Sequence, residues 1–428
     1  MGNRLEVRGL EVRGLFRIIL FLILYLQTSV THAQSLDDYF KVAAENNPGL
    51  QARYKEFEAA LQQVPQVSTL EDPTFSFGYF ISPVETRVGP QRAQFSLTQM
   101  FPWFGALRAL GDAATLIADS RYQAFLHERN KLYYQVAAAY YPLYELNQWT
   151  WIEQQNIEIL QSYKSIATIK FENGNGAMVD ILRVDIMLKD AQTNLSILTK
   201  KEKPLMTVFN KLLNRNENEV VEVADSLFVD SETGNLRKDS LFVNNPVLVE
   251  LDLKMKASEA SERAAFKKGL PKLGFGLDYL VVGERTDLGP GIAPPSDNGK
   301  NAIIPTISMS IPIFRSKYRA SLKEAQLMQE SYSLQKDEYT NTLASSYEMT
   351  WFEMQQQKEL ISLYDQQIQE SNQILSLLFT AYGNSGQEFE EVLNMQQQLL
   401  KYEKMKATAE IQYQNAQAKL NYLTAKTY

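Results

Sequence analysis

The residue types that carry most enzyme and metal chemistry are scarce in this chain. It has no cysteine and only two histidines among 428 residues, which excludes disulfides, thiolate sites, a cysteine nucleophile, acylation of an N-terminal cysteine and a polyhistidine metal site. The sequence contains no nucleophile elbow, glycine-rich phosphate loop or cluster of metal ligands. We therefore predict that the protein is not an enzyme and uses no cofactor and no resident metal ion.

The remaining candidates for chemistry are carboxylates that follow two glycine-containing breaks. Asp180 comes after the break at 174–176, and Glu391 comes after the break at 383–386. The two acids lie 211 residues apart (391 − 180). Acidic residues are favoured in the first turn of a helix by its positive end, so a purely structural role explains Asp180 and Glu391 as well as a functional one. For Glu388 and Glu390 the helix-start interpretation is preferred.

The elements that position these acids occur twice. Asn47-Pro48 recurs 198 residues later as Asn245-Pro246, and FENGNGAMVDIL from Phe171 is matched by YGNSGQEFEEVL from Tyr382. Each half is predicted to contain a short helix, two strands, a very long helix, a glycine break and a second long helix. The expected domains are a first repeat over 34–240 and a second over 241–428.

Four short stretches alternate between apolar and polar residues, at about 73–82, 91–100, 271–282 and 302–312. This alternation predicts strands with one apolar face, each about long enough to cross an outer membrane. A soluble sandwich would show the same pattern, but too little other apolar sequence is available to cover four such faces. Four strands cannot close a barrel. We therefore expect several copies of the chain to pool their strands in lipid.

The predicted long helices cover 106–171 and 317–382, which corresponds to roughly 100 Å of rod each. Pro142 should kink or loosen the first of them. The glycine breaks should stop each long helix and reverse the chain. Pro204 is expected to interrupt the following helix, and the acidic stretch 214–240 should form a small mixed segment outside the rods.

The N-terminus has the pattern of an export signal. Four arginines precede the apolar run 18–26, and Thr31-His32-Ala33 provides small residues for cleavage after Ala33. The apolar run is shorter than the roughly 20 residues of a membrane-crossing helix. The net charge of −7 suits a cation path better than an anion path and disfavours nucleic acid as a partner.

Taken together, these motifs resemble TolC-type outer-membrane efflux proteins. The resemblance rests on two copies of an NNP-helix, a strand hairpin, a QMFPWFG-like junction (99–105) and a helical hairpin with a tip sequence like that at Asp180. It implies a homotrimer in which twelve strands form one barrel in outer-membrane lipid, continued by a long periplasmic helical barrel. It also implies docking to a periplasmic adaptor and an inner-membrane pump, expected to be of the RND type. The junction is most similar to the heavy-metal branch, which includes CzcC- and CusC-like proteins, although many of its members carry an N-terminal cysteine that this chain lacks.

The resemblance also implies roles for particular residues. The acids after the tips, here Asp180 and Glu391, would line the periplasmic constriction as a ring of carboxylates. Asn394 stands where TolC-type proteins have a second acid. The ring is therefore expected to be weaker, or displaced toward Glu388, Glu390 or Asp185. A carboxylate ring in a narrow pore attracts cations. Trp103 and Phe104 are expected to be membrane-boundary anchors rather than substrate contacts. The adaptor-docking tips would be Gly174, Asn175, Gly176, Gly383, Asn384, Ser385 and Gly386. The predicted function is an exit duct for small molecules or metal cations; the alternative is the duct of a type I protein secretion system.

Overall fold

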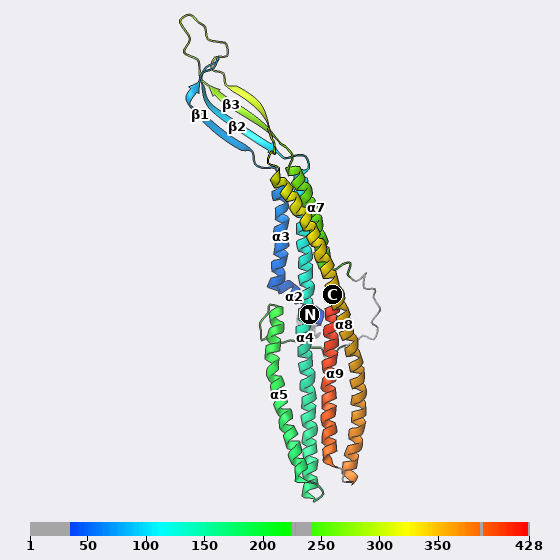
Figure 1. The fold of residues 1–428 in the computed structure, drawn as a ribbon. Helices are drawn as coiled ribbons and strands as arrows, with labels where there is room; N and C mark the ends of the chain where they lie inside the picture. The colour runs from blue at the N-terminus through cyan, green and yellow to red at the C-terminus, as the bar shows by residue number, and fades with distance from the viewer. Residues whose placement is uncertain (1–34, 225–226, 228–241, 386–387, 427–428) are drawn as a thin grey trace, which may run out of the picture.

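The computed structural model describes residues 35–224, 227, 242–385 and 388–426. The predicted signal sequence with its cleavage site, the docking residue Gly386 and most of the acidic segment 214–240 lie outside these residues. The described chain is a long rod of helices with a sheet at one end (Figure 1). The sheet and the helical hairpin tips therefore lie at opposite ends of the protein.

The sheet is built from two hairpins, one from each repeat. Its strands are β1 (Thr74–Val84), β2 (Gln91–Phe101), β3 (Lys272–Val282) and β4 (Ala302–Ser310), in the order β1-β2-β3-β4 with every neighbouring pair antiparallel. Two rows of the register run Phe77, Phe95, Tyr279, Ile303 and Phe75, Leu97, Leu277, Pro305. Because side chains alternate along a strand, the apolar faces of all four strands lie on one side of the sheet.

That apolar side is open to the surroundings in the single chain. Ile81 and Ile307 are 92% and 78% exposed. The large apolar side chains of the two register rows named above are also exposed or half-buried. The opposite side carries small and polar residues such as Ser76, Ser96 and Thr306. Within the described sheet, β1 and β4 each have one neighbour, so one backbone edge of each is left unpaired.

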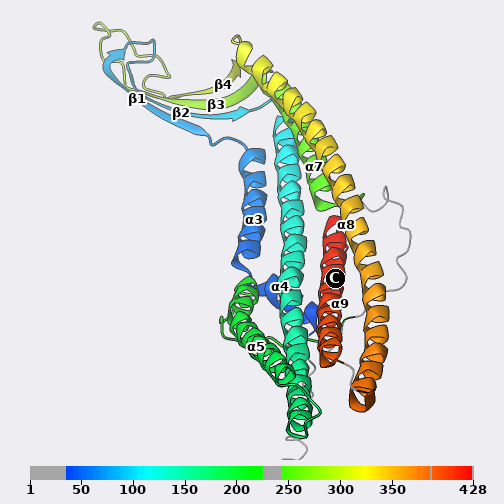
Figure 2. The same cartoon turned by 60° about the horizontal axis from the view of Figure 1, so that its bottom comes forward.

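Each repeat contributes one uninterrupted helix that runs most of the length of the rod. These are α4 (Ala106–Glu172) and α8 (Ser316–Ser385). The shorter helices are α2 (Leu36–Asn46), α3 (Pro48–Ser68), α5 (Met178–Leu212), α7 (Pro246–Lys268) and α9 (Phe389–Leu423). In both views α3 and α5 lie end to end and form one column that runs beside α4 (Figures 1 and 2). In the same way α7 and α9 lie end to end and form a column that runs beside α8. The rod is therefore a layer of four columns, in which the outer surfaces of α5 and α8 have no neighbour in the described chain.

The repeated Asn-Pro motif makes the joints in the two broken columns. Asn47 and Asn245 are the N-caps of α3 and α7, with the proline at the first helical position, where its missing N–H costs nothing. Asn47 Oδ1 accepts from the Leu50 N–H, and its Nδ2 donates to the Leu212 carbonyl at the end of α5. One asparagine thus caps the start of one helix and the end of the helix below it.

Asn245 repeats this arrangement in the second column. Its Oδ1 accepts from the Val247 N–H at 3.0 Å, and its Nδ2 donates to the Leu423 carbonyl at the end of α9 at 3.1 Å. Asn245 is 2% exposed, so neither bond can be replaced readily by water.

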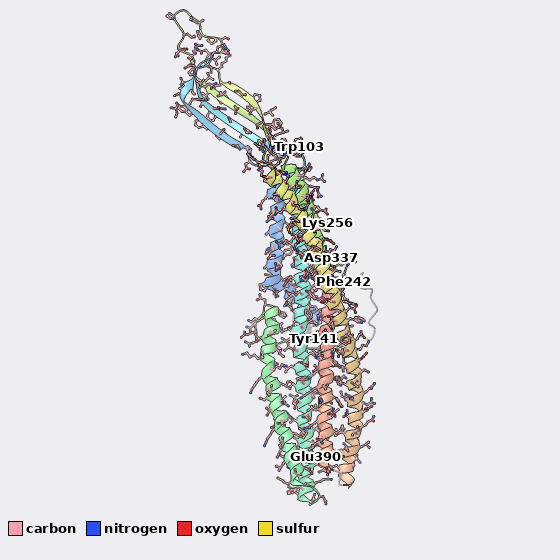
Figure 3. All side chains as sticks on the ribbon, in the orientation of Figure 1. Trp103, Tyr141, Phe242, Lys256, Asp337 and Glu390 are labelled. Carbon is pink, nitrogen blue, oxygen red and sulfur yellow. The ribbon has the colours of Figure 1, made fainter. Side chains whose placement is uncertain are left out.

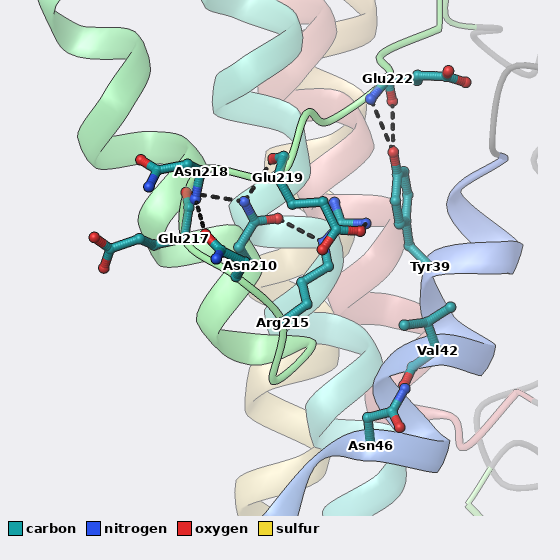
Figure 4. Close-up of polar contacts among 10 residues, drawn as sticks. Tyr39, Val42, Asn46, Asn210, Arg215, Glu217, Asn218, Glu219 and Glu222 are labelled. Atoms are coloured by element: carbon teal, nitrogen blue, oxygen red, sulfur yellow. Dashed lines mark hydrogen bonds and ion pairs between the residues drawn. The ribbon is translucent and has the colours of Figure 1, made fainter.

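The joint between α3 and α5 is reinforced by the segment that leaves α5. The Arg215 guanidinium lies over the rings of Tyr39 and Phe209, and its Nε donates to Asn210 Oδ1 (Figure 4). The Tyr39 hydroxyl accepts from the Glu222 N–H and donates to the Glu222 carbonyl. These bonds fasten the described part of the acidic segment, up to residue 224, against α2 and the end of α5.

One sequence prediction about a helix is wrong: Pro204 lies inside α5, which continues to Leu212. Packing of α5 against α4 outweighs the local preference of proline. The helix α8 ends at Ser385, inside the predicted glycine break 383–386. Pro142 lies inside α4, which runs from Ala106 to Glu172.

Among the residues that the structure describes, no helix combines the length and the apolar character needed to cross a bilayer.

Candidate functional site at the helical tips

The first hairpin tip reverses the chain through two glycines. There α4 ends at Glu172 and Gly174 adopts a positive φ of 73°, a conformation that glycine adopts without strain. A side chain at Gly176 would place its Cβ 3.0 Å from the Lys170 Cβ and from the Phe171 nitrogen, so this crowded position favours glycine. The docking prediction for these turns and for Gly383, Asn384 and Ser385 stays a prediction.

Asp180 and Glu391 both lie in the first turn of a helix, on α5 and α9 respectively. The N-caps of these helices, Ala177 and Glu388, make no side-chain capping bond. The Asp180 side chain is 15% exposed, whereas Glu391 is exposed. The equivalent acids of the two repeats therefore have different surroundings in the single chain.

A basic residue on the first hairpin connects the two tips. Arg183 Nη2 lies 2.8 Å from Glu390 Oε2 on α9, and its Nη1 lies 3.9 Å from Asp180 Oδ1 on its own helix. Glu390 occupies the level of the hairpin tips (Figure 3). From the sequence, Glu390 was expected to be a helix-start residue and Arg183 was not identified. The spacing of three residues between Asp180 and Arg183 is a signal for an ion pair along a helix.

A second contact joins the tips on α4 and α8. The Lys170 Nζ lies 3.9 Å from the centroid of the Tyr382 ring and also donates to the Tyr382 carbonyl. Burial raises the pKa of the Tyr382 hydroxyl, and the Asp180 carboxylate adds to that effect. Lys170, Asp180, Arg183, Tyr382 and Glu390 line one cavity of about 450 Å³ between the two hairpins.

The other predicted constriction residues lie apart from this cavity. Asp185 Oδ1 is 2.6 Å from the Lys164 Nζ, so it forms an ion pair between α5 and α4 within the first hairpin. Asn394 is exposed on α9 one turn beyond Glu391. Within the described residues, no group of three or more His, Asp or Glu side chains is arranged to hold a metal ion.

Trp103 and Phe104 lie where the sheet meets the helices (Figure 3). Phe104 is 79% exposed and its ring meets Trp103 edge to face. The Phe104 carbonyl accepts from the Lys267 Nζ at 3.0 Å, and Gly105 takes a positive φ as the N-cap of α4. This corner presents aromatic rings beside a lysine, a combination typical of a membrane interface.

The geometry can be compared with known proteins. A family model described as outer membrane efflux protein matches residues 40–201 and 239–426. The chain belongs to the outer membrane efflux protein family. Proteins of this family are outer-membrane channels with a periplasmic helical extension and are not enzymes, which confirms the predicted family, location and absence of enzymatic activity.

Solved structures show the same fold at low sequence identity. The outer-membrane channel OprN matches with a TM-score of 0.72 at 16% identity, over 92% of this chain and 90% of OprN. The outer-membrane protein VceC from Vibrio cholerae matches with a TM-score of 0.70 at 13% identity, over 91% and 95%. CusC matches with a TM-score of 0.71 at 15% identity, over 91% of each chain. These similar values do not favour the CusC-like branch, and no curated protein sequence matches this chain significantly.

Proposed function

We propose that three copies of this chain form an exit duct through the outer membrane. The observation that carries this proposal is the sheet register, which places four apolar strand faces on one side and leaves the edges of β1 and β4 unpaired. Pairing β1 of one copy with β4 of the next would satisfy both edges and turn the apolar side toward lipid. The free outer surfaces of α5 and α8 would meet in the same arrangement.

We infer further that the duct serves a tripartite efflux system. The tips lie at the end of the rod that is farthest from the sheet (Figure 1), so they would face a periplasmic adaptor and an inner-membrane pump, proposed to be of the RND type. Small molecules or metal cations are the proposed cargo. Single cysteines at Asn175 and Asn384 should crosslink to the adaptor, because the chain has no native cysteine. Labelling of these cysteines by an impermeant reagent outside intact cells would reverse the proposed orientation.

The assembly and its cargo need separate measurements. The mass of the detergent-extracted protein should be that of a trimer, and a stable monomeric barrel would overturn the proposal. Deleting the protein should cost the cell resistance to a drug or metal. Loss of a secreted polypeptide instead would support a protein secretion duct.

We propose that Asp180 and Glu391 form the constriction of this duct, with Arg183 as the counter-charge. Three copies would place six carboxylates near one level, and the Arg183 guanidinium lies close enough to Asp180 to offset part of their repulsion. Single-channel recordings under a salt gradient would compare the wild type with Asp180→Asn plus Glu391→Gln. We expect lower cation selectivity in the variant. An unchanged reversal potential would show that both acids serve only as helix-start residues.

A further inference from the structure

A groove on the helical wall lies well away from the tips. It has a volume of about 580 Å³ and runs between α4, α8 and α9. Its lining includes Trp149 of α4, Leu360 and Tyr364 of α8, and Lys401 and Met405 of α9. The volume falls within the range of roughly 300 to 1,000 Å³ that is common for small-molecule sites. Two aromatic rings, two flexible apolar side chains and a lysine thus converge on one hollow.

The aromatic side chains of the groove are held in place. The Trp149 Nε1 donates to the Lys404 carbonyl at 3.4 Å, which fixes the indole against α9. Tyr364 is 8% exposed and its ring stacks on Tyr402, with centroids 6.5 Å apart. A ligand would therefore meet ordered ring surfaces, which reduces the entropy lost on binding.

The residues that line the groove carry a positive charge although the protein is acidic, and the Glu145 carboxylate lies behind the lining, where it accepts from the Thr408 hydroxyl at 2.8 Å. None of the lining residues is acidic, and two are lysines. The Lys404 ammonium is paired with Glu153, which is 1% exposed. Lys401 is exposed and, among the described residues, has no acidic partner. A third ammonium, that of Lys201, lies 5.9 Å from the centroid of the Trp149 ring.

The groove shares a face of α9 with the proposed constriction acids. Counting in steps of seven, Glu391 is followed by Gln398, Met405 and Gln412, and Asn394 is followed by Lys401 and Thr408. Residues seven apart lie on one face of a packed helix. If Glu391 faces the duct, as proposed above, the groove opens into the same duct. Only this location rests on the proposed function; binding to the groove does not.

We propose that this groove binds an amphiphilic aromatic anion, a fused or linked ring system that carries one sulfonate or carboxylate. The rings would lie among Trp149, Tyr364, Leu360 and Met405, and the anionic group would pair with Lys401. An anion is specified by charge complementarity at one end of the groove, where Lys401 has no acidic partner among the described residues and lies seven residues before Thr408, whose hydroxyl donates to the Glu145 carboxylate. The aromatic and apolar side chains of the lining favour a ring system, because they offer packing surface but few hydrogen bonds to a small hydrophilic anion.

The test uses purified full-length protein in lipid nanodiscs and the probe 8-anilinonaphthalene-1-sulfonate. The probe fluoresces strongly when its rings leave water, so a saturable rise in its own emission above that of protein-free nanodiscs reports occupancy. Trp149→Ala removes a ring surface of the groove and should raise the Kd of the probe by about tenfold. Trp151→Ala is the matched control, because Trp151 lies two residues further along α4, does not line the groove and is 59% exposed; it should keep the wild-type Kd.

The role of charge is tested with a second probe and a second variant. N-phenyl-1-naphthylamine has the same rings without the sulfonate and should bind more weakly. Lys401→Gln should raise the Kd for the sulfonate by about three- to fivefold, as expected for an exposed ion pair, and leave the Kd of the neutral probe unchanged. Gln397→Trp, which places a bulky ring in an exposed part of the lining, should block both probes.

Each result is read beside the single-channel conductance of the same preparation. An unchanged Kd in Trp149→Ala, or equal affinity for the two probes in the wild type, would overturn the groove as an anion site. The absence of saturable binding in a conducting trimer would also overturn it and would leave the proposed duct intact. A preparation that binds the probe as described but does not conduct would refute the duct and not the groove.

Discussion

Asn245→Ala should weaken the joint between α7 and α9 more than the equivalent change weakens the joint in the first repeat. The substitution removes an acceptor for the Val247 N–H and a donor to the Leu423 carbonyl, and it also removes the hydrogen-bond partner of the Tyr339 hydroxyl. Asn245 is 2% exposed, so water cannot readily take over either bond. The damage should be local, because α7 and α9 each remain packed along α8.

The magnitude follows from the two bonds. Loss of an N-cap side chain costs about 1 kcal/mol, and a buried carbonyl left without a donor costs about 1–3 kcal/mol. The joint should therefore lose about 2–4 kcal/mol. Asn47→Ala removes the same pair of bonds, but Asn47 is only half-buried, so water can reach Leu212 and the loss should be about 1 kcal/mol.

Hydrogen exchange read by mass spectrometry can measure this difference locally. Amides near the start of α7 should exchange about 30-fold faster or more in Asn245→Ala, since each 1.4 kcal/mol is a factor of ten. Asn245→Ser is the discriminating variant, because its hydroxyl can keep the cap acceptor but is too short to donate to Leu423. We expect its exchange rates to lie between those of the wild type and those of the alanine variant. Wild-type rates in Asn245→Ser would refute the argument that the Leu423 bond stabilises the joint.

Three further predictions concern charged groups. Burial raises the pKa of Glu403 above 4.5, so the folded state holds this proton more tightly than the unfolded state. Folding stability is therefore lost as pH rises from about 4.5 through the folded pKa. In thermal unfolding, Glu403→Gln should be more stable than the wild type at about pH 8, and this advantage should vanish near pH 4. Lys404→Met should cost about 3–5 kcal/mol because it leaves the buried Glu153 carboxylate unpaired, and adding Glu153→Gln should recover most of that loss. Arg183→Met should change the free energy of unfolding by less than about 1 kcal/mol, because Arg183 and Glu390 are both partly exposed. It should nevertheless broaden the distribution of distances between spin labels at 175 and 384. An unchanged distribution would show that this ion pair does not hold the tips together.

The fold could be predicted from the sequence because its main signals are local and repeated. Alternation along Phe75, Phe77 and Tyr79 identifies a strand without knowledge of its partners, and the long helices follow from proline-poor apolar periodicity. The error came where tertiary contacts override local preference. Pro204 lies in α5, which packs along α4, and the sequence alone does not show how strongly that packing stabilises the helix.

The candidate site was predictable only in part. The spacing of Asp180 and Glu391 places both acids in the first turn after a tip, and the sequence shows this directly. The contacts of Arg183 with Glu390 and of Lys170 with Tyr382 join residues more than 200 positions apart, so they depend on which hairpin faces which. The repeat gave no help, because contacts between the two halves occur once and have no second copy to compare.

The two copies of the Asn-Pro joint show how duplicated sequence comes to have unequal importance. Around Asn47, the end of α5 is also fastened by Arg215 through Asn210 and through the rings of Tyr39 and Phe209. Around Asn245 the described neighbours are mainly apolar, with Phe242 and Leu423 in one cluster and Tyr339 packed against it. Burial raises the pKa of Tyr339 to about 12, against the opposing effect of its hydrogen bond to Asn245. A polar group in such dry surroundings is costly to leave without a partner, and so the same asparagine should matter more in the second repeat, where fewer polar groups could replace it.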